Sequence, residues 1–472
     1  MSQPAVSAPD LVPGTWGTVR EALRGSRRDF TQAPIGQAVI LLAVPMVLEM
    51  VMESVFAVVD IFFVGRLGAD AVAAVGITES LMTVIYAVAI GLSIGASATV
   101  ARRIGERDPD RAARSAVQSI ALGLVIAAVI GTVGAMFAPS LLRMMGASEQ
   151  VVETGSGFTR VMVGASGTAL LLFLINAIFR GAGDPAIAMR VLWFANAINI
   201  ALGPCLIFGL GPFPELGVMG AAVATSIGRG AGVVYQIYRL TRGDSRIVIR
   251  AAHLRPDPQV MSGLFRVSVS AMFQNFVATA SWMGLIRILT GFGSAAVAGN
   301  TIGIRIVTFA LLPSLGVSNA AATLVGQNLG AGRPDRAAAA VWRAAFYNTM
   351  FLSAVGVVFV AFAPLLIGIF SSEPEVINHG VHCLRIIATG FLFYGFGMVL
   401  TQAFNGAGDT RTPTLIHVVC LWMLELPLAW TLAHPLGFGP TGVFVAVSVA
   451  FSVLALVSTV LFRRGTWKTR TV

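Results

Sequence analysis

Twelve long apolar runs follow one another along the chain, and they constrain its fold more than any other feature. A helix that crosses the hydrocarbon core of a bilayer needs about 20 apolar residues, and each run is long enough for that. No connection between the runs is long enough to hold a soluble domain. The sequence therefore predicts an all-α integral membrane protein with twelve transmembrane helices. The runs cover residues 36–64, 72–99, 115–138, 157–179, 187–209, 217–238, 262–289, 296–325, 341–368, 379–403, 414–434 and 441–461.

The composition agrees with a chain that is surrounded by lipid. Only 11% of the residues are charged, whereas soluble domains carry about 25%. A net charge of +10 is compatible with a nucleic-acid partner, but the sequence has no long Lys/Arg block, and Lys468 is its only lysine. We therefore expect the lipid bilayer, and not nucleic acid, as the partner of the basic residues.

Arginine placement predicts the orientation of the helices. Arginines gather in the N-terminal tail, in the even-numbered connections between runs and at the C-terminus, whereas the odd-numbered connections hold only Arg66 and Arg143. Basic residues are enriched in cytoplasmic loops. We therefore expect both termini in the cytoplasm of a prokaryotic cell, with the chain in its inner membrane. The basic N-terminal tail could also form a short surface helix.

The chain contains an internal repeat. FRGAGD at 179–184 and FNGAGD at 404–409 are separated by 404 − 179 = 225 residues, and three further motif pairs share this offset before it drifts to 222 near Gly217 and Gly439. A duplicated unit of six helices gives two parallel halves related by a pseudo-two-fold axis along the membrane normal, with a cavity between them. The predicted organisation is a cytoplasmic tail (1–35), an N-lobe (36–240), a basic inter-lobe loop (241–258), a C-lobe (259–462) and a basic cytoplasmic tail (463–472).

Several of these motifs resemble one transporter family. LVGQNLGAGRPDRA at 324–337, its first-half counterpart ARRIGERDPDRAA, the paired GAGD turns and VDIFFVGRLG at 59–68 are similar to the multidrug and toxic compound extrusion (MATE) transporters. The resemblance covers residues 36–462. It implies two six-helix lobes, alternating access, and export of cationic or amphipathic drugs in exchange for protons or sodium ions. A duplicated chain of this kind is expected to work as a monomer.

Three carboxylates lie inside the first apolar run. On a helix, Glu53 lies about 40° and Asp60 about 20° around the axis from Glu49, so all three share one narrow face. Such a row is costly against lipid and should face the lobe interior. A carboxylate there could hold a proton in one state and a cation in the other, although a permanent bond to an arginine or to backbone groups is the simpler alternative for each.

The resemblance assigns roles in the N-lobe. Asp60 matches the family's first-helix aspartate, which takes part in cation or proton coupling, and Asn199 and Thr225 match polar positions of the fifth and sixth helices. Family members often carry Asp before the proline of the fifth helix, but Gly203 stands there in this chain. We expect Glu53 to replace that lost acid. Glu79 of the second helix is a further ion-coupling candidate because of its proximity to the first helix.

The C-lobe departs further from the family pattern. Sodium-coupled bacterial members carry acids in the seventh and tenth helices, where this chain offers Gln274, Asn275 and an uncharged stretch. Proton coupling through the N-lobe is therefore favoured over sodium coupling. Glu425, the only C-lobe acid within a span, could be a compensating site, a counter-charge for substrate or a snorkelling residue. Arg305 could bridge to Glu425 or cap backbone carbonyls. The candidates for binding substrate in a drug cavity are Gln274, Asn275, Glu425 and the aromatic residues Phe273 and Tyr394. Packing against neighbouring helices or lipid is the simpler alternative for each aromatic residue.

The sequence lacks the motifs that are typical of enzymes, metal sites and phosphate-binding loops. The five histidines form no HExxH motif, no Ser/His/Asp or Cys/His arrangement emerges, and the GAGD turns lack a phosphate-loop lysine. We expect no enzyme activity, no metal site and no cofactor beyond the coupling ion, H⁺ or Na⁺. The alternative function is a flippase or exporter of a lipid-linked precursor or polar metabolite, which would favour a strongly cationic cavity.

Overall fold

The protein is almost entirely helical. The computed structural model describes residues 14–67, 69–243 and 245–470, and within these ranges it has no strand. The first thirteen residues of the predicted N-terminal tail lie outside the described residues. After α1 (Thr15–Arg24), the first half contains α2 (Ile35–Val64), α3 (Ala69–Gly105), α4 (Pro109–Met136), α5 (Ala138–Met144), α6 (Glu149–Gly164), α7 (Ser166–Ala182), α8 (Pro185–Phe208) and α9 (Val218–Thr241).

The second half repeats this order with more interruptions. Its helices are α10 (Pro258–Leu289), α11 (Ser294–Gly330), α12 (Pro334–Gly368), α13 (Pro374–Thr389), α14 (Phe391–Gly406), α15 (Arg411–His417), α16 (Leu426–Ala433) and α17 (Pro440–Arg464). A π-helical segment, η4 (Val418–Glu425), joins α15 to α16. Short 3₁₀ turns are η1 (Gly65–Leu67), η2 (Ala251–Leu254), η3 (Thr290–Phe292) and η5 (Thr466–Thr469).

Each predicted apolar run is helical over nearly its whole length, although the runs at 157–179, 379–403 and 414–434 are each divided between consecutive helices. Nine helical segments of the described chain are long and apolar enough to cross a membrane, and the pair α13 and α14, bent by 60° at Gly390, makes a tenth. The remaining two runs form α9 and α10, which have 24 and 32 residues and are therefore also long enough to cross a membrane. The sequence did not reveal the break between α6 and α7, the short helix α5, or the π-helical segment. The basic helix predicted in the N-terminal tail forms as α1.

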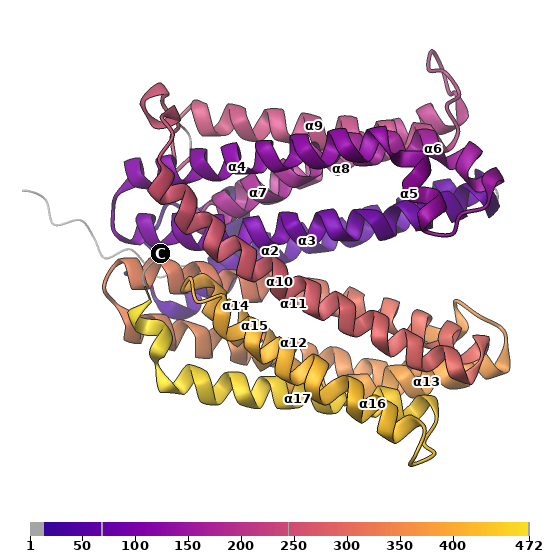
Figure 1. The fold of residues 1–472 in the computed structure, drawn as a ribbon. Coiled ribbons are helices and arrows are strands. Elements are labelled where there is room, and N and C mark those ends of the chain that lie inside the picture. Colours follow the sequence, from indigo (N-terminus) through magenta and orange to yellow (C-terminus); the bar gives the residue numbers. More distant parts are fainter. Residues whose placement is uncertain (1–13, 68, 244, 471–472) are drawn as a thin grey trace, which may run out of the picture.

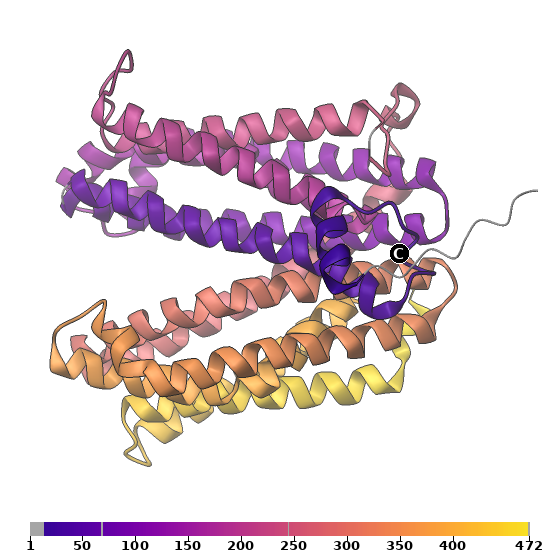
Figure 2. The ribbon, with the colours of Figure 1, turned by 180° about the vertical axis from the view of Figure 1, so that it is seen from behind.

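The helices form two bundles (Figures 1 and 2). Helices α2–α9 make up one bundle and α11–α17 lie in the other, while α10 crosses from the first towards the second. The two bundles lie close together at one end and diverge towards the opposite end. Offsets between equivalent helix ends confirm the repeat, since α3 and α11 begin at 69 and 294 (294 − 69 = 225) and end at 105 and 330 (330 − 105 = 225).

We call the end at which the bundles meet the closed end. There, Gly105 at the end of α3 lies against Gln327 of α11, and Gly330 at the end of α11 lies against Arg102 of α3. A Cβ atom on either glycine would overlap a backbone carbonyl oxygen of the opposite helix. Helices in membranes associate most closely through such small residues. The glycines of the repeated motif therefore permit the two halves to touch, backbone against backbone.

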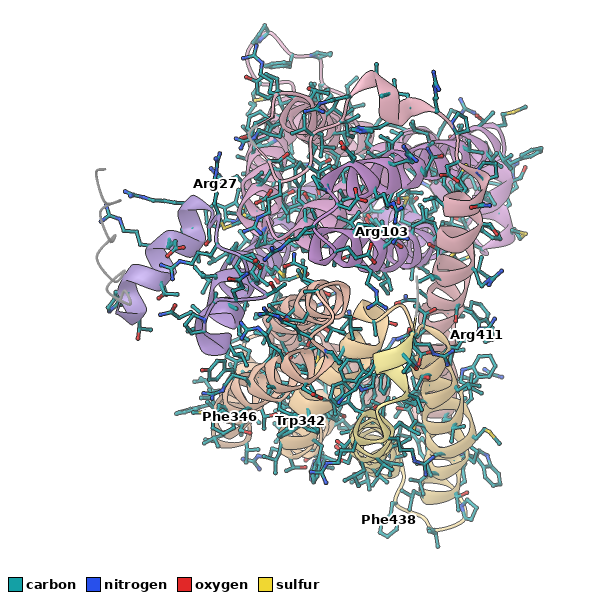
Figure 3. The ribbon with its side chains drawn as sticks, turned by 90° about the vertical axis from the view of Figure 1, so that its left-hand side faces the viewer. Arg27, Arg103, Trp342, Phe346, Arg411 and Phe438 are labelled. Atoms are coloured by element: carbon teal, nitrogen blue, oxygen red, sulfur yellow. The ribbon has the colours of Figure 1, made fainter. Side chains whose placement is uncertain are left out.

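Further contacts fasten the closed end. Thr323 Oγ1 donates to the carbonyl oxygen of Arg180 (3.2 Å), and Gln327 Nε2 donates to that of Gly181 (3.0 Å). Residues Ala38–Met46 of α2 pack into the same buried cluster as Leu324 and Val325 of α11. Figure 3 views the molecule from this end, where Arg27, Arg103 and Arg411 are labelled.

Candidate functional site

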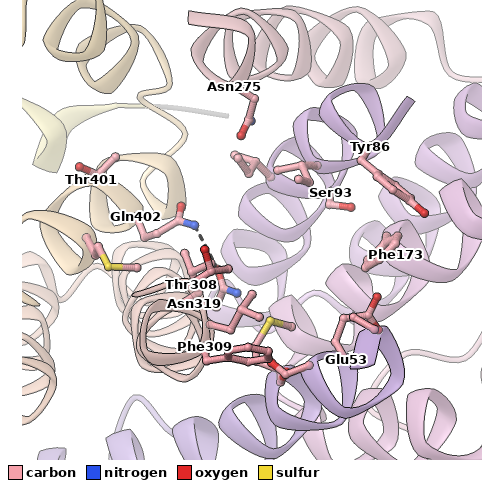
Figure 4. Close-up of a pocket in the computed structure, with 18 of the residues that line it drawn as sticks. Glu53, Tyr86, Ser93, Phe173, Asn275, Thr308, Phe309, Asn319, Thr401 and Gln402 are labelled. Carbon is pink, nitrogen blue, oxygen red and sulfur yellow. Dashed lines mark hydrogen bonds between the residues drawn. The ribbon is translucent and has the colours of Figure 1, made fainter. Parts of the chain in front are cut away.

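A cavity of about 1220 Å³ lies between the two halves. Drug-sized ligands occupy pockets of roughly 300–1,000 Å³, so this volume is large enough for one. Side chains from both halves point into it, with Glu53 on one side and Asn319 on the other (Figure 4). The cavity reaches Asn405 and Gly406, next to the closed end.

Three predicted acids and one arginine gather on the N-terminal wall. Glu53 and Asp60 of α2 and Glu79 of α3 all line the cavity, and so does Arg229 of α9. The guanidinium of Arg229 attracts all three carboxylates electrostatically. It forms no direct ion pair with them among the described residues, and its Nη2 instead donates to the hydroxyl of Tyr86 at 3.1 Å. The arrangement leaves room for a small species between the acids and the arginine.

A smaller cavity lies within this cluster. Asp60, Glu79, Thr225 and Arg229 line a volume of about 20 Å³, which is enough for one water molecule. Thr225 accepts a hydrogen bond from Nδ2 of Asn199 at 2.7 Å. The structure therefore places Asp60, Glu79 and Thr225 at one water-sized site, while Asn199 lies behind Thr225 and orients it.

Glu49 has a different environment from the other two acids of its row. Its side chain is buried, with Oε1 at 2.7 Å from Nη1 of Arg180 and at 3.1 Å from Nδ2 of Asn176. Gln236 donates in turn to Asn176 at 2.7 Å. Glu49 does not line the cavity, although Arg180 does. Glu49 and Arg180 thus form a buried ion pair inside the first half. For Glu49 the structure therefore shows the permanent bond to an arginine that the sequence left open as the alternative to ion coupling.

The candidates of the second half are divided between the cavity wall and other environments. Gln274, Asn275 and Tyr394 line the cavity, and the Tyr394 side chain is buried. Phe273 does not line it; its exposed ring stacks on Phe276. Glu425 does not line it either, because its buried carboxylate accepts a hydrogen bond from Ser281 Oγ at 2.5 Å. The suggested bridge between Arg305 and Glu425 does not form.

Sequence reasoning missed the role of Arg180. Arg180 follows the apolar run 157–179, so the sequence places it among the arginines of the even-numbered connections, but in the structure it lies near the end of α7 and pairs with Glu49. The repeat contains a signal for this pair: positions 49 and 180 become Gln274 and Asn405 at the 225-residue offset. Both partners lose their charge together, as expected for two residues in contact.

Among the described residues, no group of three or more His, Cys, Asp or Glu side chains is arranged to hold a metal ion. Asp60 and Glu79 of the N-terminal wall share their small cavity with Thr225 and Arg229. The carboxylates, guanidinium and hydroxyl groups that line the cavity are suited to binding and releasing small solutes or protons.

Comparison with known proteins gives one consistent result. The family model described as MatE matches residues 45–205 and 270–431. The probable multidrug resistance protein NorM of Thermotoga maritima is 28% identical over 446 residues, covering 93% of this chain and 94% of that protein. The FAD transporter of Shewanella oneidensis is 26% identical over 407 residues, covering 85% of this chain and 89% of that protein.

The solved structures agree with the family model. The outward-facing conformation of a multidrug resistance MATE family transporter of the MOP superfamily superposes with a TM-score of 0.88 at 26% identity, covering 94% of this chain and 98% of that chain. The two stretches matched by the family model begin 270 − 45 = 225 residues apart, at the offset of the repeat. These relatives are transporters and not enzymes. The chain therefore belongs to the MatE family of multi-pass membrane transporters.

Proposed function

We propose that this protein exports cationic or amphipathic drugs from a prokaryotic cell in exchange for protons, as a secondary transporter in the inner membrane with both termini in the cytoplasm. The relatives named as multidrug resistance and multidrug export proteins support the substrate class. The cavity between two halves that meet at one end supports alternating access. In this orientation the closed end is cytoplasmic, and a single chain carries the complete cavity, as a functional monomer requires.

The observation that carries proton coupling is the water-sized cavity among Asp60, Glu79, Thr225 and Arg229. A carboxylate that takes up a proton loses its attraction to the guanidinium, so each protonation loosens the hold of α9 on α2 or α3. A drug cation approaching Glu53 or Asp60 competes for the same carboxylates. Protons and drug thus exclude each other from the N-terminal wall, which is the requirement for exchange.

Sodium is the weaker candidate for the coupling ion. A sodium ion in the small cavity would be repelled by the permanent charge of Arg229, since an arginine side chain stays protonated. The wall that should supply C-lobe acids offers amides, namely Gln274 and Asn275. The fixed cation at the centre of the cluster favours an exchange of protons over an exchange of metal ions.

The direct test is counterflow of ethidium in proteoliposomes under an imposed pH gradient or an imposed sodium gradient. We expect the pH gradient alone to drive transport, and Asp60→Asn and Glu53→Gln to abolish or strongly reduce the dependence. Glu153→Gln is the matched control, because Glu153 is an exposed acid of α6 that does not line the cavity. Transport that ignores both gradients, or that survives both substitutions unchanged, contradicts the coupling proposal.

Export of a polar metabolite is the second candidate function. One relative is named an FAD transporter, and Arg305 places a cationic group in the cavity wall of the second half. Uptake of flavin adenine dinucleotide into inverted proteoliposomes that fail to transport ethidium would favour this alternative.

A further inference from the structure

The cavity is divided by charge. Five of its charged lining residues belong to the first half: Glu53, Asp60, Glu79, Arg180 and Arg229. Arg305 of α11 is the only charged residue that the second half contributes to the described lining. One wall therefore carries acids with their arginines, and the opposite wall carries a single cation among apolar, amide and hydroxyl groups.

Arg305 differs from the other two cavity arginines in lacking a partner. Arg180 is held by Glu49 and Arg229 by Tyr86 and the neighbouring carboxylates. Among the described residues, Arg305 makes no hydrogen bond, ion pair or ring contact, and its side chain is exposed. A permanent cation within a membrane span is costly and marks a functional position. Because no described residue of the chain pairs with this guanidinium, its partner is expected to be an anionic group of a bound molecule.

The neighbourhood of Arg305 on α11 is suited to an oxyanion with an apolar body. Thr301 and Thr308 lie one turn to either side and also line the cavity, and Phe309, the residue after Thr308, presents its ring there too. Both threonine hydroxyls donate back to carbonyl oxygens of α11, so the guanidinium is the free donor. Its planar set of N–H groups matches the two oxygens of a carboxylate or phosphate.

We propose that Arg305 forms an anion subsite of the substrate cavity, so that the protein accepts amphipathic zwitterions as well as simple cations. The positive part of such a substrate faces Glu53, Asp60 and Glu79, and its carboxylate or phosphate oxygens bind Arg305. The proposal rests on the proposed transport function and narrows its substrate class. Glu425, the acid that the sequence suggested as a partner for Arg305, is bonded to Ser281 outside the cavity lining and makes no ion pair with Arg305 among the described residues.

The test uses two dyes that differ by one group. Rhodamine 110 carries a free carboxylate, and rhodamine 123 is its methyl ester, a cation with the same ring system. Equilibrium binding of each dye to the purified full-length protein is measured by fluorescence anisotropy. In Arg305→Gln we expect binding of rhodamine 110 to weaken by about tenfold to a hundredfold, the range of a charge-assisted hydrogen bond, while binding of rhodamine 123 changes by less than about twofold.

Two further variants keep the result interpretable. Arg305→Lys retains the charge without the planar fork, so it should recover part of the rhodamine 110 affinity. Arg287→Gln removes an exposed arginine of α10 that does not line the cavity, and it should leave both dyes unchanged. If Arg305→Gln does not fold, Arg305→Lys still tests the preference by comparing the two dyes.

The outcomes separate this inference from the proposed function. Equal loss of both dyes in Arg305→Gln, no loss of either, or tighter binding of rhodamine 123 alone would overturn the anion subsite. Wild-type protein that binds rhodamine 123 but not rhodamine 110 would also overturn it, while leaving drug export intact. Wild-type protein that binds neither dye would count against the proposed function itself.

Discussion

In the first half of the molecule, Glu49 and Arg180 form a buried ion pair, and 225 residues further along the chain Gln274 and Asn405 occupy the same two positions. The helices that carry them have corresponding lengths and order in the two halves. The two halves therefore share one framework but differ at this pair of positions, which is charged in the first half and carries two amides in the second.

The same difference recurs at the cavity wall. At the 225-residue offset, Asp60 and Glu79 correspond to Leu285 and Ile304, and at the later offset of 222 Arg229 corresponds to Phe451. The glycines of the closed end show the opposite behaviour, since Gly105 and Gly330 are alike in sequence and in contact. Close approach of backbones occurs on both sides of the pseudo-two-fold axis, whereas the carboxylates of the cavity wall occur on only one.

Substitution of the buried ion pair gives the largest expected effect on stability. Glu49→Gln or Arg180→Asn alone leaves one buried charge without its partner, and such a loss costs about 3–5 kcal/mol. The double variant copies Gln274 and Asn405 of the second half and should be more stable than either single variant, because two neutral amides can share hydrogen bonds. A double-mutant cycle of unfolding in detergent measures the coupling. If the losses of unfolding free energy in the two single variants simply added in the double variant, the amide pair of the second half would not be able to replace the ion pair of the first.

The closed end should respond equally in both halves. Gly105→Ala and Gly330→Ala each place a methyl group against a backbone carbonyl of the opposite helix, at a cost of about 1–3 kcal/mol to the closed contact. We expect both variants to shift the population towards a separated closed end and to slow transport. Spin labels at Arg114 and Ala339, exposed positions 225 residues apart, would report the separation as a longer distance.

The control for this pair is Gly263→Ala. Gly263 lies within α10 and would have no atom within 4 Å of an added Cβ, so this variant should keep the wild-type distance. A change in only one of Gly105→Ala and Gly330→Ala would contradict the equivalence of the two halves at the closed end.

The sequence predicted the framework more fully than it predicted the site. Apolar runs and the repeat offset sufficed for the helices because lipid leaves few other ways to satisfy a backbone. Arginine partners were harder to assign. Arg180 resembles a loop residue by its place next to GAGD, yet its long side chain reaches Glu49 on another helix. Glu49 and Glu53 share a helical face, but neighbouring helices place one in an ion pair and the other in the cavity wall.

Glu425 offers a smaller and contrasting effect in the second half. It is buried like Glu49, but it accepts one hydrogen bond from Ser281 and pairs with no cation among the described residues. Glu425→Gln keeps an acceptor for that hydroxyl, so we expect stability to change by about 1 kcal/mol or less. Thermal unfolding beside Glu49→Gln makes the comparison direct. A loss as large as that of Glu49→Gln would reveal a charge partner for Glu425.

The smallest effect concerns the segment that joins α1 to α2, which both halves hold in different ways. On the side of the first half, Asp29 accepts from Thr31 N (2.9 Å) and pairs with Arg107 (3.3 Å); on the other side, Arg333 donates to the carbonyl oxygen of Thr31 (2.8 Å). Burial alone would raise the pKa of the Asp29 carboxyl, but the hydrogen bonds from Thr31 and the charge of Arg107 outweigh it and hold this pKa below its ordinary value of 3.8.

A lowered carboxyl pKa contributes stability above the ordinary value, and that stability is lost as the pH falls through the lowered pKa. Asp29→Asn should therefore reduce the unfolding temperature slightly at pH 7, by about 1–2 °C because the pair is exposed, and the difference from wild type should close in acid. Arg333→Gln removes a contact to a backbone carbonyl, so its loss should be the same at both pH values. Thermal unfolding of both variants at neutral and acid pH compares the two sides of the segment directly. If Arg333→Gln also converged on wild type in acid, the carboxylate would not be what distinguishes the two halves here.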